Sequence, residues 1–300
     1  MKRIIVIFSL TLFAFIHFSC RQNVNTNEKV KEHIEIENDG VKIAYQDSGD
    51  GDTCLLFIHG WAINKEYWQA QVEYFNKRFR IVTIDLPGFG ESGKNRTDWS
   101  VEKYGKDISK VLTELKLNNV ILIGHSMSGA IIVEAALKNP DKIIGIVGVD
   151  NFKDFGVAPT EEDKKRSGEA YKKLRINYTL FVQEIANKYL FSPSTDSIIK
   201  AKVINDFMSA DSTIAAEIAE RNDEYPLNEK LKAVNKTLYL INSSEYPTDT
   251  VRFKESEISC TLYLVGPTGH YPMIEAPDKF NKALDSIINR MNTVLFESEY

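Results

Sequence analysis

Residues 121–130 read ILIGHSMSGA. An apolar run ends at Gly124-His125-Ser126, and a second apolar run begins directly after Ser128-Gly129. The first run is typical of a buried strand and the second of a helix, so the small residues between them indicate a sharp strand-to-helix turn. Glycine and serine are also ordinary turn residues, so this stretch alone does not decide between a plain turn and a functional one.

The serine at the centre of this turn is a candidate nucleophile. A serine hydroxyl needs an adjacent base, and its oxygen has to stand clear of the backbone. A strained strand-to-helix turn presents it in this way, but only small residues fit two positions before and after the serine. Gly124 and Ser128 meet that condition around Ser126, although glycine is usual where Ser128 stands. The alternative is a plain glycine/serine turn.

A second motif, HGW at residues 59–61, follows the apolar run LLFI. An acyl-transfer intermediate needs two N–H donors for its oxyanion. We expect these donors to be the backbone N–H groups of Trp61 and Met127, because Met127 opens a helix whose N-terminus favours negative charge. The alternative is a strand-ending turn with a packed tryptophan.

The candidate base lies near the end of the chain, in GPTGHYPMIEAPDKF at residues 266–280. Of the five histidines, only His270 lies in a loop between the last expected strand and the last expected helix. An imidazole with a pKa near ~6.5 can take a serine proton and return it. His270 is therefore the expected partner of Ser126.

Strand and helix signals alternate on both sides of a charged helical stretch at about residues 160–230. A hairpin is expected around Asn38-Asp39-Gly40. Further strands are expected in TCLLFIHG, RIVTIDL, NNVILIG, KIIGIVGVD, KTLYLIN and CTLYLVG, and helices over residues 65–77, 100–116, 127–138 and 277–292. Continuous apolar strands bounded by glycine predict an α/β protein whose parallel sheet is covered on both faces.

Four motifs, HGW, DLPGFGES, GHSMSG and GHYPMIEAPDKF, occur in an order and spacing that resemble the α/β-hydrolase superfamily. The resemblance covers roughly residues 40–292. It implies an eight-stranded, mostly parallel sheet flanked by helices, with a helical cap inserted between strands six and seven. Residues 33–151 and 230–300 would form this core, and residues 152–229 the cap. It also implies a Ser–His–acid triad.

The acid of that triad has two candidate positions. The superfamily most often takes it from the loop after strand seven, here LINSSEYPTDT, which offers Glu245 and Asp249 but lacks the usual glycine–aspartate pair. Some members place it after strand six, where Asp150 stands at the strand tip. Functional groups of open α/β sheets gather at the carboxyl ends of strands, so we favour Asp150. Asp85, in DLPGFGES, is expected to bind turn N–H groups instead.

The first twenty residues, MKRIIVIFSLTLFAFIHFSC, predict an export signal. Lys2 and Arg3 precede an apolar run that is shorter than the ~20 residues of a membrane-spanning helix. A small residue before Cys20 resembles a bacterial lipobox. We therefore expect a lipoprotein-type signal peptide over residues 1–19, lipid on Cys20, and a polar tether over residues 20–32. Plain secretion and a retained anchor are the alternatives.

Charge and cysteine content restrict the partners. The formal net charge of −5 and the lack of a long basic run give no support for nucleic-acid binding. No Cys/His spacing of a metal site occurs, and we expect neither metal nor cofactor. Cys54 and Cys260 lie in apolar runs typical of buried free thiols, with a disulfide as the alternative.

Together these features predict an exported serine hydrolase, anchored in the cell envelope only through its N-terminal lipid. A carboxylesterase that cleaves a small-molecule ester through an acyl-enzyme on Ser126 is the favoured function. The same residues also suit another acyl or carbon–carbon bond hydrolase, a lactonase, a peptidase or a cofactor-free haloperoxidase. A ligand-binding protein on the same fold is the alternative from another class. The substrate and the oligomeric state stay open.

Overall fold

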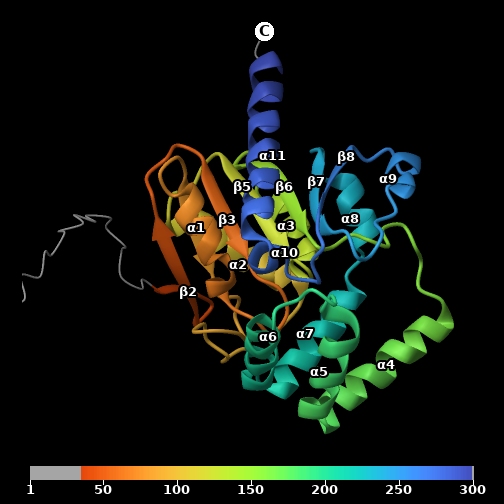
Figure 1. The fold of residues 1–300 in the computed structure, drawn as a ribbon. Helices are drawn as coiled ribbons and strands as arrows, with labels where there is room; N and C mark the ends of the chain where they lie inside the picture. The colour runs from red at the N-terminus through yellow and green to blue at the C-terminus, as the bar shows by residue number, and fades with distance from the viewer. Residues whose placement is uncertain (1–34, 299–300) are drawn as a thin grey trace, which may run out of the picture.

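A computed structural model describes residues 35–298 of the chain, with side chains as far as Thr293. The expected signal peptide, Cys20 and the whole expected tether lie outside the described residues. The described chain forms an α/β structure around one sheet of eight strands (Figure 1). These strands are β1 (Glu35–Asn38), β2 (Val41–Ser48), β3 (Cys54–Ile58), β4 (Arg80–Ile84), β5 (Val120–His125), β6 (Ile143–Val149), β7 (Leu238–Ser243) and β8 (Cys260–Val265).

The sheet is mostly parallel, as the sequence predicts. Its spatial order is β1-β2-β4-β3-β5-β6-β7-β8, and only the pairs β1–β2 and β2–β4 are antiparallel. The central strands β3, β4 and β5 are buried almost throughout, because helices cover both faces of the sheet. The register pairs Ile58 with Gly124 and Gly124 with Gly148. The carboxyl ends of β3, β5 and β6 therefore lie side by side.

The predicted hairpin is present at the edge of the sheet. Asp39 and Gly40 connect β1 to β2 with φ values of +52° and +78°. Two successive residues with positive φ are the geometry of a two-residue hairpin turn of the type that an Asp-Gly pair favours.

Helices form a layer on each face of the sheet. In Figure 1, α1 (Gln69–Phe75) and α11 (Pro277–Ser298) lie in front, whereas α2 (Val101–Glu114) and α3 (Ser128–Lys138) lie behind. Ser100 caps α2, since its hydroxyl accepts a hydrogen bond from the Lys103 N–H at 3.2 Å. The helix expected over residues 65–77 is divided, because a 3₁₀ turn at Lys65–Trp68 precedes α1.

The segment between β6 and β7 is helical and lies across the carboxyl ends of the parallel strands (Figure 1). It contains α4 (Glu161–Ile176), α5 (Tyr178–Ile185), a π-helical turn (Ala186–Leu190), α6 (Ser197–Ser209) and α7 (Ser212–Glu224). We call residues 152–226 the insert. The next helix, α8 (Leu227–Ala233), packs against α3 of the core. The expected boundary at residues 229–230 therefore falls within α8.

Buried contacts fasten the insert to the core. The indole N–H of Trp61 donates to the Ala215 carbonyl at 2.8 Å, and the Trp61 ring lies 5.0 Å from the Phe207 ring. The Tyr67 hydroxyl donates to Asp206 at 2.7 Å. The candidate oxyanion loop and the insert are thus in direct contact.

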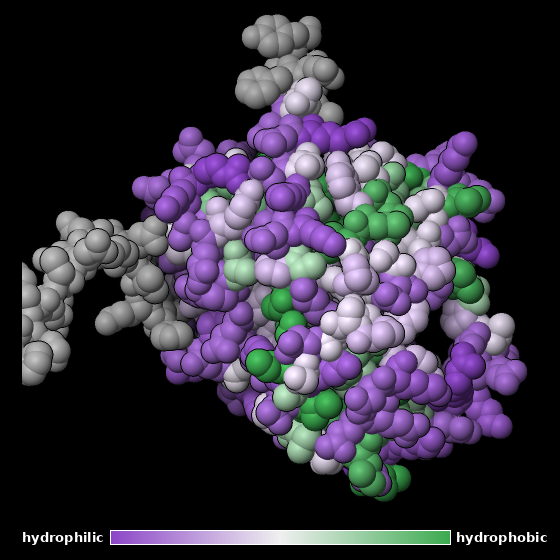
Figure 2. Space-filling view, in the orientation of Figure 1, coloured by the Kyte–Doolittle hydropathy of each residue, from purple (hydrophilic) through white to green (hydrophobic). Residues whose placement is uncertain are grey.

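On the face that Figure 2 shows, apolar side chains reach the surface at separate points. Figure 2 shows apolar spots with hydrophilic side chains between them, some of the spots over the insert at the bottom of the view. The most exposed apolar side chains of the insert are Ile176, Leu180 and Ile198. Single exposed apolar residues of this kind are normal for a folded protein. Among residues 35–298, no helix has both the length and the apolar character that crossing a bilayer requires.

The two cysteines of the described chain are free thiols. Cys54 begins β3 and Cys260 begins β8, and three strands separate these two in the sheet. Because neighbouring strands lie about 4.7–4.9 Å apart, these two sulfurs are too distant for a disulfide. The free-thiol interpretation is therefore confirmed for this pair.

Candidate active site

Three loops at the carboxyl edge of the sheet bring the candidate triad together. Ser126 follows β5, Asp150 follows β6, and His270 lies in the loop between β8 and α10 (Pro272–Glu275). The Ser126 Oγ lies 2.8 Å from His270 Nε2, and His270 Nδ1 lies 2.5 Å from an Asp150 carboxylate oxygen. The structure thus joins the three residues in one chain of hydrogen bonds.

The turn at Ser126 has the strained geometry that its sequence predicts. Ser126 has a φ of +54°, in the left-handed region that a residue with a side chain rarely adopts. Gly124 has to be a glycine, because a Cβ there would lie 2.6 Å from the Ser128 carbonyl oxygen and 2.7 Å from the Ile132 side chain. Helix α3 packs directly against the end of β5 for this reason, and the serine oxygen projects from the bend.

Ser128, where the usual pattern has glycine, has a structural use in this chain. Its side chain is fully buried, and its hydroxyl donates to the His59 carbonyl at 2.5 Å. The hydrogen bond ties the first residue of α3 to the HGW loop. The departure from the usual motif therefore adds a link between the two segments that carry the candidate oxyanion donors.

The HGW loop lies against the serine. A Cβ on Gly60 would lie 3.2 Å from the Ser126 Cβ and 2.4 Å from His125 Nδ1, so only glycine allows this approach. Among the described residues, none accepts a hydrogen bond from the backbone N–H of Trp61 or of Met127. Both donors are therefore free to bind a ligand oxygen beside Ser126.

The Asp150 carboxylate is buried and accepts hydrogen bonds from three donors. One oxygen faces His270, while the other accepts the Ser243 backbone N–H at 2.8 Å and the Lys153 ammonium at 2.8 Å. Burial raises the pKa of Asp150, but the hydrogen bond and charge of His270 and the charge of Lys153 outweigh it and hold the pKa at about 2. The ionised carboxylate accepts the His270 Nδ1–H, which leaves Nε2 to accept the serine proton.

The other two candidate acids do not take this position. Glu245 and Asp249 are exposed, and no hydrogen bond joins either side chain to His270 within the described chain. Asp249 instead pairs with Arg252 at 3.1 Å. Asp85 binds turn N–H groups as expected, accepting those of Lys65 and Glu91.

A pair of asparagines, which the sequence reasoning did not identify, holds the strand ends together. The Asn151 amide donates to the carbonyls of Gly124 and Ser126, and the Asn242 amide donates to the Asn151 carbonyl at 2.9 Å. Asn242 also accepts the Asn151 backbone N–H at 3.2 Å. The position of both residues at strand tips is the signal that could have found them.

The loop of His270 is fixed from three sides. The His270 N–H donates to the Leu190 carbonyl of the insert at 2.8 Å. Its carbonyl accepts the His125 Nε2–H at 2.8 Å. Glu275 accepts the backbone N–H groups of Gly269 and Tyr271, on either side of the histidine. The base is therefore held by β5, by α10 and by the insert together.

Two further histidines are buried beside the site in neutral form. His59 accepts the Leu86 N–H at Nε2 and donates from Nδ1 to the Gly60 carbonyl. Burial lowers the pKa of His59, and burial together with the nearby His270 lowers the pKa of His125 to about 3. Both imidazoles thus support the backbone of the site without charge.

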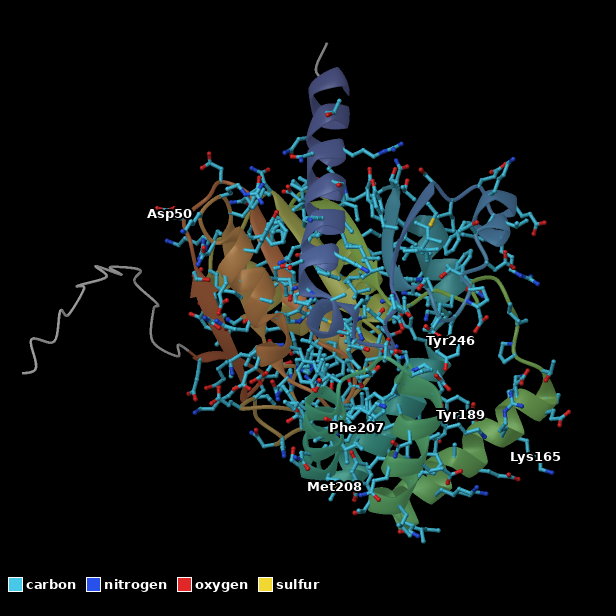
Figure 3. All side chains as sticks on the ribbon, in the orientation of Figure 1. Asp50, Lys165, Tyr189, Phe207, Met208 and Tyr246 are labelled. Atoms are coloured by element: carbon cyan, nitrogen blue, oxygen red, sulfur yellow. The ribbon has the colours of Figure 1, made fainter. Side chains whose placement is uncertain are left out.

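A cavity of about 400 Å³ opens beside the Asp150–His270 pair. Figure 3 shows Tyr246 at the lower end of the core and Tyr189 near it on the insert. The other residues around the pair are Lys153, Asp154, Leu190 and Pro247. A second cavity, of about 500 Å³, lies between residues 97–102 and 217–225 and contains none of the triad residues. Of these two cavities, the first adjoins the candidate base, His270.

Comparisons with known proteins agree with this architecture. The sequence profile described as alpha/beta hydrolase fold matches residues 53–277. The (E)-2-((N-methylformamido)methylene)succinate hydrolase of Acinetobacter baylyi is 31% identical over 99 residues, which are 33% of this chain and 37% of that protein. A Mycobacterium tuberculosis protein is 29% identical over 152 residues, which are 50% of this chain and 44% of that protein. The matches thus span less than half of these curated relatives.

Solved structures resemble the fold over most of the chain. An esterase from Thermogutta terrifontis superimposes with a TM-score of 0.75 at 21% identity, over 87% of this chain and 99% of that one. A bromoperoxidase from Bacillus anthracis gives 0.76 at 17% identity, over 86% and 99%. Such low identity supports the fold alone. Since the family profile covers three quarters of the sequence, the chain belongs to the α/β-hydrolase fold family.

Proposed function

We propose that this protein is a serine hydrolase that cleaves a carboxylic ester through an acyl-enzyme on Ser126. The observation that carries the proposal is the unbroken chain from the Ser126 hydroxyl through His270 to the ionised Asp150. The hydrolase of Acinetobacter baylyi, which is 31% identical over 99 residues, supports the hydrolase class.

The geometry suits each step of the reaction. The Ser126 Oγ attacks the acyl carbonyl while His270 Nε2 takes its proton, and Asp150 stabilises the resulting imidazolium. The N–H groups of Trp61 and Met127 hold the oxyanion. His270 then returns the proton to the leaving alkoxide, which departs as an alcohol. Water attacks the acyl-enzyme with His270 again as base, and the carboxylic acid and free Ser126 are released.

The proposal is tested with p-nitrophenyl esters from acetate to laurate. We expect hydrolysis that falls to background in Ser126→Ala and by about 10³–10⁴-fold in kcat in Asp150→Asn. Glu245→Gln is the matched control and should keep full activity, because its side chain is exposed and has no bond to His270. A large loss in Glu245→Gln with an active Asp150→Asn would contradict the assignment of the acid.

Labelling with a fluorophosphonate separates a wrong substrate from a wrong mechanism. If no ester is turned over but Ser126 is labelled, the nucleophile works and another acyl substrate or leaving group is indicated. If no ester is turned over and Ser126 is not labelled, a ligand-binding role on this fold would replace the hydrolase.

We also propose that the protein is exported and carries lipid on Cys20. The basic pair, the short apolar run and the small residue before Cys20 support this proposal. In cells fed a clickable fatty acid, the protein should be labelled and fractionate with membranes, and Cys20→Ser should lose both properties. Unchanged labelling of Cys20→Ser would contradict lipidation at this residue.

A further inference from the structure

Lys153 places a positive charge on the candidate triad acid, opposite the base. Its Nζ lies 2.8 Å from one oxygen of Asp150, while His270 binds the other oxygen. The Asp150 side chain is 1% exposed and that of Lys153 is 18% exposed, so water screens this pair only weakly. The carboxylate is thus shared between an imidazole and an ammonium group.

The loop after β6 folds back so that Lys153 lies against Asp150. Asp150 and Phe152 both have positive φ, +47° and +54°, which folds the loop after β6 into a tight turn. The Lys153 carbonyl accepts the Asp249 N–H at 3.1 Å, and its ammonium lies 5.1 Å from the centre of the Tyr246 ring. The loop after β7 therefore holds Lys153 by its backbone and by its charge.

We propose that Lys153 is a positioning residue of the triad, which fixes the orientation of the Asp150 carboxylate and offsets part of the negative charge that Asp150 presents to His270. The proposal rests on the proposed serine-hydrolase function. Lys153 touches neither Ser126 nor the candidate oxyanion donors, so it acts through Asp150 alone.

Two effects follow from this arrangement. The ammonium opposes the imidazolium form of His270, because like charges several ångströms apart repel through a weakly screened interior. Its loss should therefore favour protonated His270 and move the acid limb of activity to higher pH. Its loss also leaves the Asp150 oxygen that Lys153 binds held by the Ser243 N–H alone, and the less firmly held carboxylate should lower kcat without changing KM.

Other charged and titratable groups surround the cluster, and all of them are unchanged in the Lys153 variants proposed below. They come from the ends of β5, β6 and β7, from the insert and from the His270 loop: His125, Asp154, Tyr246, Tyr189, Tyr271 and Glu275. His125 stays neutral in the working range, since its pKa is about 3. A difference between wild type and a Lys153 variant therefore reports Lys153 itself.

The primary experiment is an NMR titration of the His270 imidazole, which needs no substrate. The resonances are assigned by their absence in His270→Gln, and the midpoint is compared in wild type, Lys153→Gln and Lys153→Arg. We expect Lys153→Gln to raise the midpoint, because a cation near the imidazolium is removed, and Lys153→Arg to restore most of the wild-type value. Lys138→Gln is the matched control, because Lys138 also pairs with a buried carboxylate, Glu134 at 3.0 Å, on the core helix α3.

The pH profile of kcat/KM is the second readout. Normalised to its own plateau, the acid limb of Lys153→Gln should move as the NMR midpoint does, with kcat reduced several-fold and KM unchanged. A midpoint that does not move would overturn the proposal. A change confined to KM would also overturn it and would assign Lys153 to substrate binding.

If Lys153→Gln does not fold, Tyr246→Leu is the second variant, because it removes only the exposed ring beside the ammonium. It should raise the midpoint by a smaller amount, and an unmoved midpoint in this variant would overturn the proposal. Absence of Ser126-dependent turnover, with the NMR shift present, would refute the proposed function alone.

Discussion

Ser126 holds a backbone conformation that its own side chain disfavours. A φ of +54° costs a non-glycine residue roughly 1–2 kcal/mol, and the neighbouring turn at Asp150 and Phe152 repeats the same region of φ. The strain persists because Gly124, the start of α3 and the Asn151 amide fix the turn around it. The position of the serine oxygen is therefore obtained at a cost in folding stability.

A glycine at this position should show that cost. Ser126→Gly and Ser126→Ala both remove the hydroxyl, but only glycine adopts a positive φ without strain. We expect Ser126→Gly to be more stable than Ser126→Ala by about 1 kcal/mol in urea unfolding. Equal stability of the two variants would contradict a strained turn. Neither variant should hydrolyse esters.

At the scale of elements, the site depends on hydrogen bonds between loops that are distant in sequence. The strands and the hairpin could be predicted, because alternation and apolar runs are local signals. Asp150 could be favoured because it stands at a strand tip. The Lys153–Asp150 contact and the Ser243 N–H could not be predicted, since both depend on how the loops after β6 and β7 fold against each other. The short helix α9 (Val251–Glu255) also lacked a sequence signal.

The hydrogen bond from Ser128 to the His59 carbonyl should matter for both stability and activity. In Ser128→Ala the buried carbonyl loses its partner, so we expect a loss of about 1–3 kcal/mol in the free energy of unfolding. We also expect kcat to fall several-fold while KM changes little, because the HGW loop is less firmly held against the serine turn. Ser286→Ala serves as control, because the exposed Ser286 hydroxyl bonds only to the Lys282 carbonyl within α11. Unchanged kcat in a folded Ser128→Ala would contradict the link.

At the scale of the whole molecule, the active-site edge contains two buried neutral histidines, His59 and His125. Burial lowers the pKa of both below the ordinary value of 6.5, and that of His125 to about 3. Unfolding exposes these imidazoles, and the unfolded chain binds the proton more tightly. Their contribution to stability is therefore present above pH 6.5 and is lost as the pH falls below 6.5, for His125 down to about pH 3.

This linkage predicts a protein that is sensitive to mild acid. Below pH 6.5, proton uptake by each of the two histidines on unfolding should lower the free energy of unfolding by up to about 1.4 kcal/mol per pH unit. Urea unfolding between pH 7.5 and 5 measures this slope. His125→Gln, whose amide can replace the Nε2–H bond to the His270 carbonyl, should have a shallower slope than wild type. Identical slopes would contradict a neutral buried His125.

The hydrogen bond between the Leu190 carbonyl and the His270 N–H links the position of the insert to the position of the catalytic base. A lid that swings on free hinges can open while the catalytic groups stay assembled beneath it. Here the insert cannot lift away at Leu190 without breaking this hydrogen bond, which leaves the loop of His270 held by His125 and Glu275 alone. An opening of the insert would thus loosen the base while the entrance is open, and substrate entry and full alignment of the triad would alternate during each turnover.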